Sequence, residues 1–271
     1  MPSILSEFLK NADRFQKNPC FLYKEGGRWR SYSWVEARES VSHLAAALKR
    51  LGVKKGDAVA LFSATRIEWT ISDLAILSVG AVSVPIYQSN TAEQATYIIE
   101  DSQAKVVIVE NPALHQKISG VGRQVILISG HVEDSKVLYF KDLLQTAEDP
   151  TWRGGVDRLE ASDLASYVYT SGTTGPPKGV ILTHGIIMAG VEACDRLLAI
   201  PQDKVALMFL PLAHILAREI QFFQIYRGFC HAYAEGIEKL LDNMGETKPY
   251  FFAAVPRIFE KVYEKVLSQV E

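Results

Sequence analysis

Cysteine and net charge are both scarce in this sequence of 271 residues. Its three cysteines, Cys20, Cys194 and Cys230, lie far apart and form no C-x-x-C pair, which excludes a zinc ribbon and a disulfide framework. Lysine and arginine number 29 against 31 aspartates and glutamates, so the strongly basic surface of a nucleic-acid-binding protein is excluded. The sequence therefore predicts a protein of the reducing cytoplasm with no nucleic-acid partner.

Long uninterrupted hydrophobic runs are also absent. The stretch 71–87 contains Asp73, and the stretch 205–217 is too short to span a bilayer. Residues 1–15 carry two acidic side chains and lack the apolar core of a secretory signal. Because 48% of the residues are nevertheless hydrophobic, disorder is excluded, and the chain is long enough to bury a core without metals or disulfides.

What the sequence does contain is an alternation of short apolar strands and amphipathic helices. Residues 21–32 are typical of a β-hairpin, and Ser33 stands three residues before Glu36, the spacing of a capping box at a helix start. Segment 147–160 is weakly periodic, so we expect a surface loop and a break in the winding of the first sheet. This order predicts an α/β fold whose parallel sheets are covered by helices on both faces. Strands are expected at 57–64, 81–86, 105–110, 124–129, 166–170, 179–183, 205–210, 229–234 and 250–255, and helices at 67–78, 184–198 and 214–226.

One loop, YTSGTTGPPKGVILTH at 169–184, concentrates the residues that carry chemistry. Glycines let the backbone present its N–H groups, hydroxyls add further donors, and a lysine adds a positive charge, a combination that suits a polyphosphate. The spacing is neither G-x-x-x-x-G-K-[ST] nor G-x-G-x-x-G, and a polar turn between two strands is the alternative. We expect Pro176 and Pro177 to stiffen the turn and hold Lys178 away from the strand. The candidate binding residues are Thr170, Ser171, Gly172, Thr173, Thr174, Gly175 and Lys178.

The string TSGTTGPPKGV resembles the phosphate-binding loop of the adenylate-forming superfamily, which includes acyl-CoA synthetases, luciferases and the adenylation domains of peptide synthetases. PLAHILARE at 211–219 is similar to the Pro-Leu-x-His segment of that family. Segments 81–110 and 251–266 resemble the long-chain fatty acyl-CoA synthetase branch. In this branch Glu-Arg commonly follows three and four residues after the histidine, whereas here Ala217 and Arg218 stand there and Glu219 follows.

The resemblance implies that residues 1–271 are the N-terminal part of an AMP-binding domain. The family folds as two α/β subdomains with the substrates between them. By that resemblance one subdomain covers 55–200 and contains the phosphate loop at 169–179, while 1–54 plus 201–271 form an incomplete second one.

The reaction implied is the ATP-dependent activation of a fatty acid. The carboxylate attacks the α-phosphate of ATP to give an acyl-adenylate and diphosphate, and coenzyme A then displaces AMP to leave acyl-CoA. Carried over by position, the loop residues from Thr170 to Gly175, with Lys178, cradle the β- and γ-phosphates, and Thr170 also contacts Mg²⁺. His214 positions the carboxylate rather than acting as a base, because a fatty acid is already ionised near pH 7. A satisfied core histidine is the alternative for His214.

Several parts used by the family are missing from this sequence: the Tyr-Gly-x-Thr-Glu segment, the ribose-binding aspartate, the hinge and the small domain with its adenylation lysine. The amphipathic helix expected from residue 256 has no stop signal before Glu271. We therefore expect the N-terminal half of a longer protein, inactive by itself. The alternatives are an enzyme that adenylates another carboxylic acid and a non-catalytic fragment that binds nucleotide or acyl groups. A fatty acid substrate also suggests peripheral visits of a cytoplasmic protein to the membrane.

Overall fold

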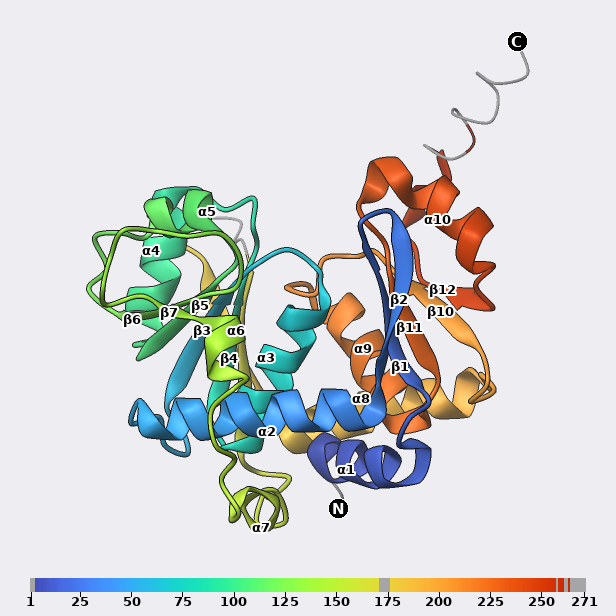
Figure 1. The fold of residues 1–271 in the computed structure, drawn as a ribbon, viewed down its shortest axis with the longest axis horizontal. Coiled ribbons are helices and arrows are strands. Elements are labelled where there is room, and N and C mark those ends of the chain that lie inside the picture. The colour runs from blue at the N-terminus through green and yellow to red at the C-terminus, as the bar shows by residue number, and fades with distance from the viewer. Residues whose placement is uncertain (1–2, 171–175, 257, 261–262, 264–271) are drawn as a thin grey trace.

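The computed structural model describes residues 3–170, 176–256, 258–260 and 263 (Figure 1). A seven-stranded sheet has the order β7-β6-β5-β3-β4-β8-β9, and a five-stranded sheet has the order β12-β10-β11-β1-β2. The first is built from β3 (Ala58–Phe62), β4 (Val82–Ile86), β5 (Val106–Val109), β6 (Gln124–Leu127), β7 (Leu138–Tyr139), β8 (Leu164–Thr170) and β9 (Lys178–Thr183). The second is built from β1 (Pro19–Glu25), β2 (Arg28–Ser33), β10 (Val205–Met208), β11 (Cys230–Tyr233) and β12 (Phe251–Phe252).

Helices alternate with these strands, and the predicted α/β fold is confirmed. They are α1 (Ile4–Phe15), α2 (Trp34–Arg50), α3 (Ile67–Ser78), α4 (Ala92–Asp101), α5 (Pro112–Lys117), α6 (Phe140–Leu143), α7 (Trp152–Val156), α8 (His184–Leu197), α9 (Ile215–Arg227) and α10 (Leu240–Thr247), with a 3₁₀ turn at Ile237–Lys239. Pairing is parallel except for two hairpins, β1–β2 and β8–β9. The sheets are thus mostly rather than wholly parallel. None of the helices in the described part of the chain is long and apolar enough to cross a bilayer.

Both faces of the first sheet are covered because alternate residues of its buried strands point to opposite sides. Ala60 and Phe62 of β3 belong to one apolar cluster together with Ile98 of α4 and residues of α5. Val59 and Leu61, their neighbours in sequence, belong to a different cluster that includes residues of α2 and α3. The uninterrupted apolar strands predicted from the sequence therefore pack against helices on both faces of the sheet.

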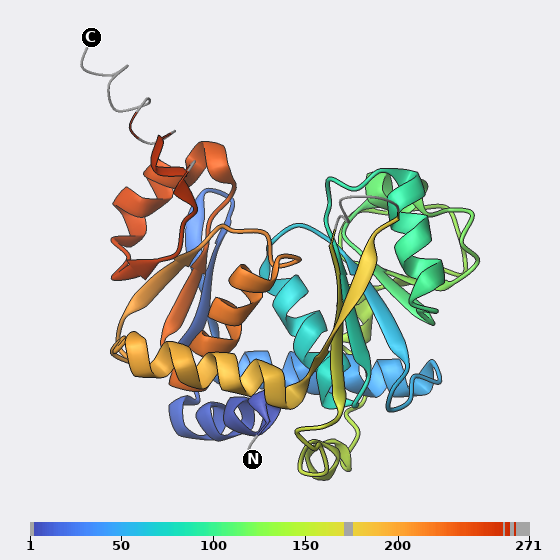
Figure 2. The same ribbon diagram turned by 180° about the vertical axis from the view of Figure 1, so that it is seen from behind.

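Helices α3 and α9 lie between the two sheets (Figures 1 and 2). A single cluster of buried residues runs from Val59 in the first sheet through Leu74 on α3 and Phe222 on α9 to Tyr233 in the second sheet. Helix α8 runs from the end of β9 toward the second sheet (Figure 2), and α10 packs Leu240 on the outer face of that sheet. One continuous core therefore packs against both sheets through α3 and α9.

The start of α2 confirms a local prediction. Ser33 Oγ accepts a hydrogen bond from the Glu36 N–H, while the Glu36 carboxylate accepts one from the Ser33 N–H, so the capping box is complete. The expected strand at 250–255 is reduced to β12, and most of the expected helix from residue 256 lies outside the described residues.

The segment 147–160 differs from the expected surface loop. It contains the helix α7, whose Trp152 and Val156 are buried, and the Trp152 indole N–H donates to Ser78 Oγ of α3 at 2.8 Å. Two apolar side chains four residues apart supply the packing that the Pro/Gly content of the segment obscured. The winding of the sheet does change across this segment, since β7 lies at one edge and β8 pairs with β4.

Candidate functional site

The strands β8 and β9 hold the two ends of the phosphate-binding loop predicted from the sequence. Thr170, the last residue of β8, pairs directly with Lys178, the first residue of β9, and both side chains are exposed. The expectation that the two prolines hold Lys178 away from the strand is wrong, because the hairpin continues up to Lys178. Directly opposed residues of an antiparallel pair have Cβ atoms roughly 5 Å apart on the same face. The five intervening candidates, Ser171, Gly172, Thr173, Thr174 and Gly175, lie outside the described residues.

A cleft of about 440 Å³ brings Thr170 together with His214. It is also lined by Tyr87, Asn90 and Gln94, which come shortly after the carboxyl end of β4 in the sequence. Thr170 belongs to the first sheet, whereas His214 follows β10 of the second sheet, so the cleft lies where the two sheets meet. Carboxyl ends of parallel strands are the usual place for ligand sites in α/β folds. Lys178 is not among the lining residues, but its neighbour Pro177 is.

Tyr169 supports the hairpin from the side. Its hydroxyl donates a hydrogen bond of 2.6 Å to the Asp101 carboxylate at the end of α4, and its ring lies against Gly179 on the paired strand. An added Cβ at Gly179 would lie 3.2 Å from the ring, so glycine permits this close approach. Burial, together with the hydrogen bond to Asp101, raises the pKa of Tyr169 and keeps the phenol protonated. Sequence reasoning missed this pair because the partners are 68 residues apart.

His214 is the N-cap of α9, and the structure places it on the surface rather than in the core. Its Nδ1 accepts a hydrogen bond of 3.2 Å from the Leu216 N–H. With Nδ1 occupied as an acceptor, the neutral imidazole carries its proton on Nε2, which is then left as a hydrogen-bond donor. The alternative of a satisfied core histidine is therefore excluded for His214.

Thr65 holds the segment that leads to His214. Its hydroxyl donates to the Leu210 carbonyl at 2.8 Å and accepts from the Leu212 N–H at 3.0 Å. Thr65 itself lies in the loop between β3 and α3, so this clamp joins a loop of the first sheet to the loop that follows β10 of the second. A residue that uses both its donor and its acceptor fixes the local backbone more firmly than a single bond would.

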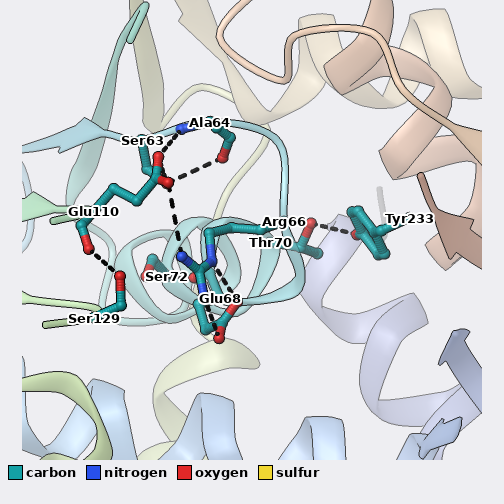
Figure 3. A network of polar contacts seen from close by, with 9 residues as sticks. All are labelled: Ser63, Ala64, Arg66, Glu68, Thr70, Ser72, Glu110, Ser129 and Tyr233. Atoms are coloured by element: carbon teal, nitrogen blue, oxygen red, sulfur yellow. Dashed lines mark hydrogen bonds and ion pairs between the residues drawn. The ribbon is translucent and has the colours of Figure 1, made fainter. Parts of the chain in front are cut away.

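A polar network fixes the loop that carries Thr65 (Figure 3). The Glu110 carboxylate, at the end of β5, accepts a hydrogen bond of 2.7 Å from the Ala64 N–H and lies 3.8 Å from the Arg66 guanidinium. Arg66 in turn binds Glu68 through two hydrogen bonds of 2.7 and 2.9 Å. The Ser129 hydroxyl donates to the Glu110 carbonyl at 2.8 Å, which connects β5 to the end of β6. The network thereby connects the carboxyl ends of β3, β5 and β6 to the start of α3.

Several aromatic residues lie on α9 and in the segment that follows it. Phe222, Phe223 and Phe229 are buried in the apolar clusters, which supports core packing for these three. Tyr233 is also buried, but it lines a second cleft of about 490 Å³ together with Tyr23 and Arg66.

Arg218 is buried, with 1% of its side chain exposed, and faces an equally buried Asp73 of α3. Its Nε and one terminal nitrogen donate to the two Asp73 carboxylate oxygens at 2.9 and 2.7 Å, and the other terminal nitrogen donates to the Ser166 hydroxyl of β8. The Ser166 hydroxyl donates to the Ser83 carbonyl at 2.7 Å. Each guanidinium nitrogen thus donates either to β8 of the first sheet or to α3.

Glu219 is the acidic residue that follows this arginine. Its Oε1 is buried and has no hydrogen-bond partner among the described residues, and it lies against Gly190 of α8. Burial raises the pKa of the Glu219 carboxyl from 4.5 to about 7. The folded state therefore holds this proton more tightly than the unfolded state does, and stability must fall as the pH rises from 4.5 to about 7.

The pH dependence of unfolding should report this carboxyl. Relative to Glu219→Gln, we expect the unchanged protein to lose about 1–2 kcal/mol of unfolding free energy between pH 5 and pH 8, a range that allows for partial solvent access. Burial lowers the pKa of His184 to about 4, which makes stability rise with pH over an overlapping range. That contribution is common to both proteins and cancels in the comparison. Urea unfolding at several pH values measures the difference, and parallel pH profiles would contradict the assignment.

No three histidine, cysteine, aspartate or glutamate side chains come together in a metal-holding group within the described ranges. The Thr170 hydroxyl lines the cleft, and hydroxyl, phosphate and water oxygens are ligands that Mg²⁺ accepts.

Comparison with known proteins places this arrangement in a family. A model described as AMP-binding enzyme matches residues 8–270. The long-chain-fatty-acid–CoA ligase FadD15 of Mycobacterium tuberculosis is 35% identical over 246 residues, covering 88% of this chain and 41% of that protein. The peroxisomal long chain acyl-CoA synthetase 6 of Arabidopsis thaliana is 29% identical over 259 residues, covering 90% and 36%. The chain thus spans less than half the length of these curated relatives.

Solved structures share the fold. The N-terminal domain of FACL13 from Mycobacterium tuberculosis superposes with a TM-score of 0.80 at 22% identity, covering 96% of this chain and 64% of that one. The anthranilate CoA ligase AuaEII, solved in complex with anthranoyl-AMP, superposes with a TM-score of 0.82 at 21% identity, covering 95% and 50%. Together with the family match over nearly the whole sequence, these findings show that the chain belongs to the AMP-binding enzyme family.

Proposed function

We propose that this chain forms the phosphate- and carboxylate-binding part of a long-chain fatty acid–CoA ligase. The reaction is the conversion of fatty acid, ATP and coenzyme A to acyl-CoA, AMP and diphosphate through an acyl-adenylate. The observation that carries the proposal is the placement of Thr170, opposite Lys178 on the hairpin, in the same cleft as His214. Groups suited to a polyphosphate and a donor suited to a carboxylate thus meet at one junction.

The first step joins two anions and expels a third, so its barrier is dominated by charge. Lys178 supplies a full positive charge at the mouth of the loop, and the Thr170 hydroxyl supplies a donor or a metal ligand beside it. Residues 171–175 belong to the same proposed cradle. Mg²⁺, when bound, would neutralise phosphate charge and align the leaving diphosphate, and Thr170 is the described residue whose oxygen would contact it.

His214 orients the acid in this proposal. Its Nε2–H donor would bind a carboxylate oxygen and hold it in line with the phosphate region lined by Thr170. A role in proton abstraction is unnecessary because the carboxyl group is already ionised near neutral pH. Thr65 anchors the backbone that leads to His214, because it binds Leu210 and Leu212, four and two residues before the histidine. This anchoring at the start of α9 favours such a positioning role.

The choice of a fatty acid rests on the relatives rather than on the fold. AuaEII has the same fold and is an anthranilate CoA ligase, so the fold is compatible with other carboxylic acids. The 35% identity to a long-chain ligase favours the fatty acid. A subdomain over 55–200 and an incomplete second one over 1–54 plus 201–271 belong to the same proposal, supported by the strands of each sheet lying within those ranges. The proposal also includes a location in the cytoplasm, with visits of the protein to the membrane surface to collect its substrate.

Binding of stable acyl-adenylate analogues tests the proposal without requiring turnover. We expect the hexadecanoyl sulfamoyl-adenosine to bind at least about tenfold more tightly than the acetyl analogue, because each buried methylene contributes roughly 0.8 kcal/mol. His214→Ala should reduce the affinity for both analogues by weakening the hold on the acyl carbonyl end. Calorimetry measures the affinities. Preference for a benzoyl analogue would indicate another acid, and equal affinity for AMP alone would indicate a nucleotide-binding fragment.

A further inference from the structure

The link between the two sheets at Arg218 connects both halves of the proposed site. On α9, the Arg218 N–H donates to the His214 carbonyl at 3.1 Å, so the two residues are one helical turn apart. On β8, Ser166 lies four residues before Thr170, an even spacing that puts both on the same face of the strand. The guanidinium that binds Ser166 is therefore attached to the element of His214 and to the element of Thr170.

The link between Arg218 and Asp73 buries two charges, which simple packing of the core would not require. Arg218 and Asp73 are both almost fully buried, and taking two charges out of water is costly unless every donor and acceptor is satisfied. Here each of the three guanidinium nitrogens donates to one oxygen, two of the carboxylate and one of the hydroxyl. The ring centres of Phe222 and Trp69 lie 5.2 and 5.9 Å from the guanidinium carbon. Apolar side chains would fill the same volume without the desolvation cost, but they would not set a defined direction between α9 and β8.

We propose that Arg218 is a positioning residue: through Ser166 and Asp73 it sets the placement of the His214 end of α9 relative to the Thr170 end of β8. This inference rests on the proposed function for its consequence, since a ligand that spans both halves is sensitive to their relative placement. A ligand that contacts only the phosphate-binding loop is not sensitive to this relative placement. Misplacement of reacting groups by about 1 Å is enough to lower reaction rates by roughly a hundredfold.

Two serines on neighbouring strands provide a matched pair of variants. Ser83 of β4 pairs directly with Ser166 of β8, and both are fully buried. The Ser83 hydroxyl has no hydrogen-bond partner among the described residues, whereas the Ser166 hydroxyl accepts from Arg218. Each of the variants Ser83→Ala and Ser166→Ala therefore removes one buried hydroxyl group, and the two positions are paired neighbours. Only Ser166→Ala removes the hydrogen bond to Arg218. Arg218→Lys cuts it from the other end and leaves the Ser166–Ser83 hydrogen bond in place.

The direct test is a distance measurement. Nitroxide labels at Leu216 on α9 and Ile181 on β9, both exposed, report the placement of the two elements by pulsed electron resonance in a Cys194→Ser background. We expect a narrow distance distribution in the unchanged protein and in Ser83→Ala. In Ser166→Ala and Arg218→Lys it should be shifted or broadened. Unchanged distributions in these two variants would overturn the proposal.

Binding provides the second readout. We expect Ser166→Ala to weaken the hexadecanoyl sulfamoyl-adenosine about tenfold while inorganic pyrophosphate binds within roughly twofold of its original affinity. Equal weakening of both ligands, or of neither, would mean a structural role only and would overturn the proposal. If the unchanged protein does not bind pyrophosphate, the proposed function fails, and the label distances still decide whether Arg218 positions the two elements.

Discussion

Replacing Lys178 with alanine is expected to weaken the binding of inorganic pyrophosphate, and of ATP with Mg²⁺, by about 10- to 100-fold. A hydrogen bond from a charged donor contributes roughly 1.5–3 kcal/mol, and here the ligand carries several negative charges. Lys178 is exposed in the structure, so its ammonium group is available to a ligand. The loss should shrink as salt is added, because screening weakens the same interaction. Calorimetric titration at two salt concentrations measures both effects.

Lys10→Ala is the matched control for this experiment. Lys10 is also an exposed lysine, but it lies on α1 and its partner is Glu7 at 3.1 Å. Its removal changes the net charge by the same amount as Lys178→Ala and should leave pyrophosphate affinity unchanged. If both variants lose affinity equally, the effect is one of overall charge. If neither does, the hairpin does not bind polyphosphate and the phosphate loop is wrongly placed.

Local patterns in the sequence predicted most of the fold because they are read from neighbouring residues. The capping box at Ser33 and the helix at 67–78 depend on contacts within one element, and both are found as predicted. The error at 147–160 arose where a five-residue helix is stabilised by burial of Trp152 against α3. A helix this short has little propensity signal, so tertiary packing decides its conformation.

The parts of the site that sequence reasoning missed are those made by distant partners. The composition of the loop pointed to Thr170 and Lys178, and the family resemblance pointed to His214, but neither carries information on what holds these residues. The Arg218–Asp73 pair spans 145 residues, and so does the hydrogen bond from Thr65 to the Leu210 carbonyl. A buried acid inside an apolar run, Asp73, was visible in the sequence as a break in hydrophobicity. Its partner became visible only when α3 and α9 were placed side by side.

The Arg218–Asp73 pair also predicts the largest change in stability. Asp73→Ala should lower the unfolding free energy by about 3–5 kcal/mol, because it leaves the Arg218 charge buried without its carboxylate. Replacing both residues, as Asp73→Leu with Arg218→Met, should recover most of that loss, since an apolar pair has no desolvation cost to offset. Urea unfolding measures both free energies. Asp203→Ala, which removes the exposed partner of Lys204 at 2.9 Å, serves as the control and should leave the unfolding midpoint unchanged.

The double variant separates stability from positioning. If Arg218 served stability alone, the recovered double variant would bind the hexadecanoyl sulfamoyl-adenosine as the unchanged protein does. We expect instead that it folds with near-original stability, binds pyrophosphate normally and binds the spanning analogue about tenfold more weakly, because no group then directs α9 toward Ser166. An Asp73→Ala variant as stable as the unchanged protein would show that the Arg218 charge finds water or another partner, and that the pair is not as isolated from solvent as its 1% and 2% exposure indicates.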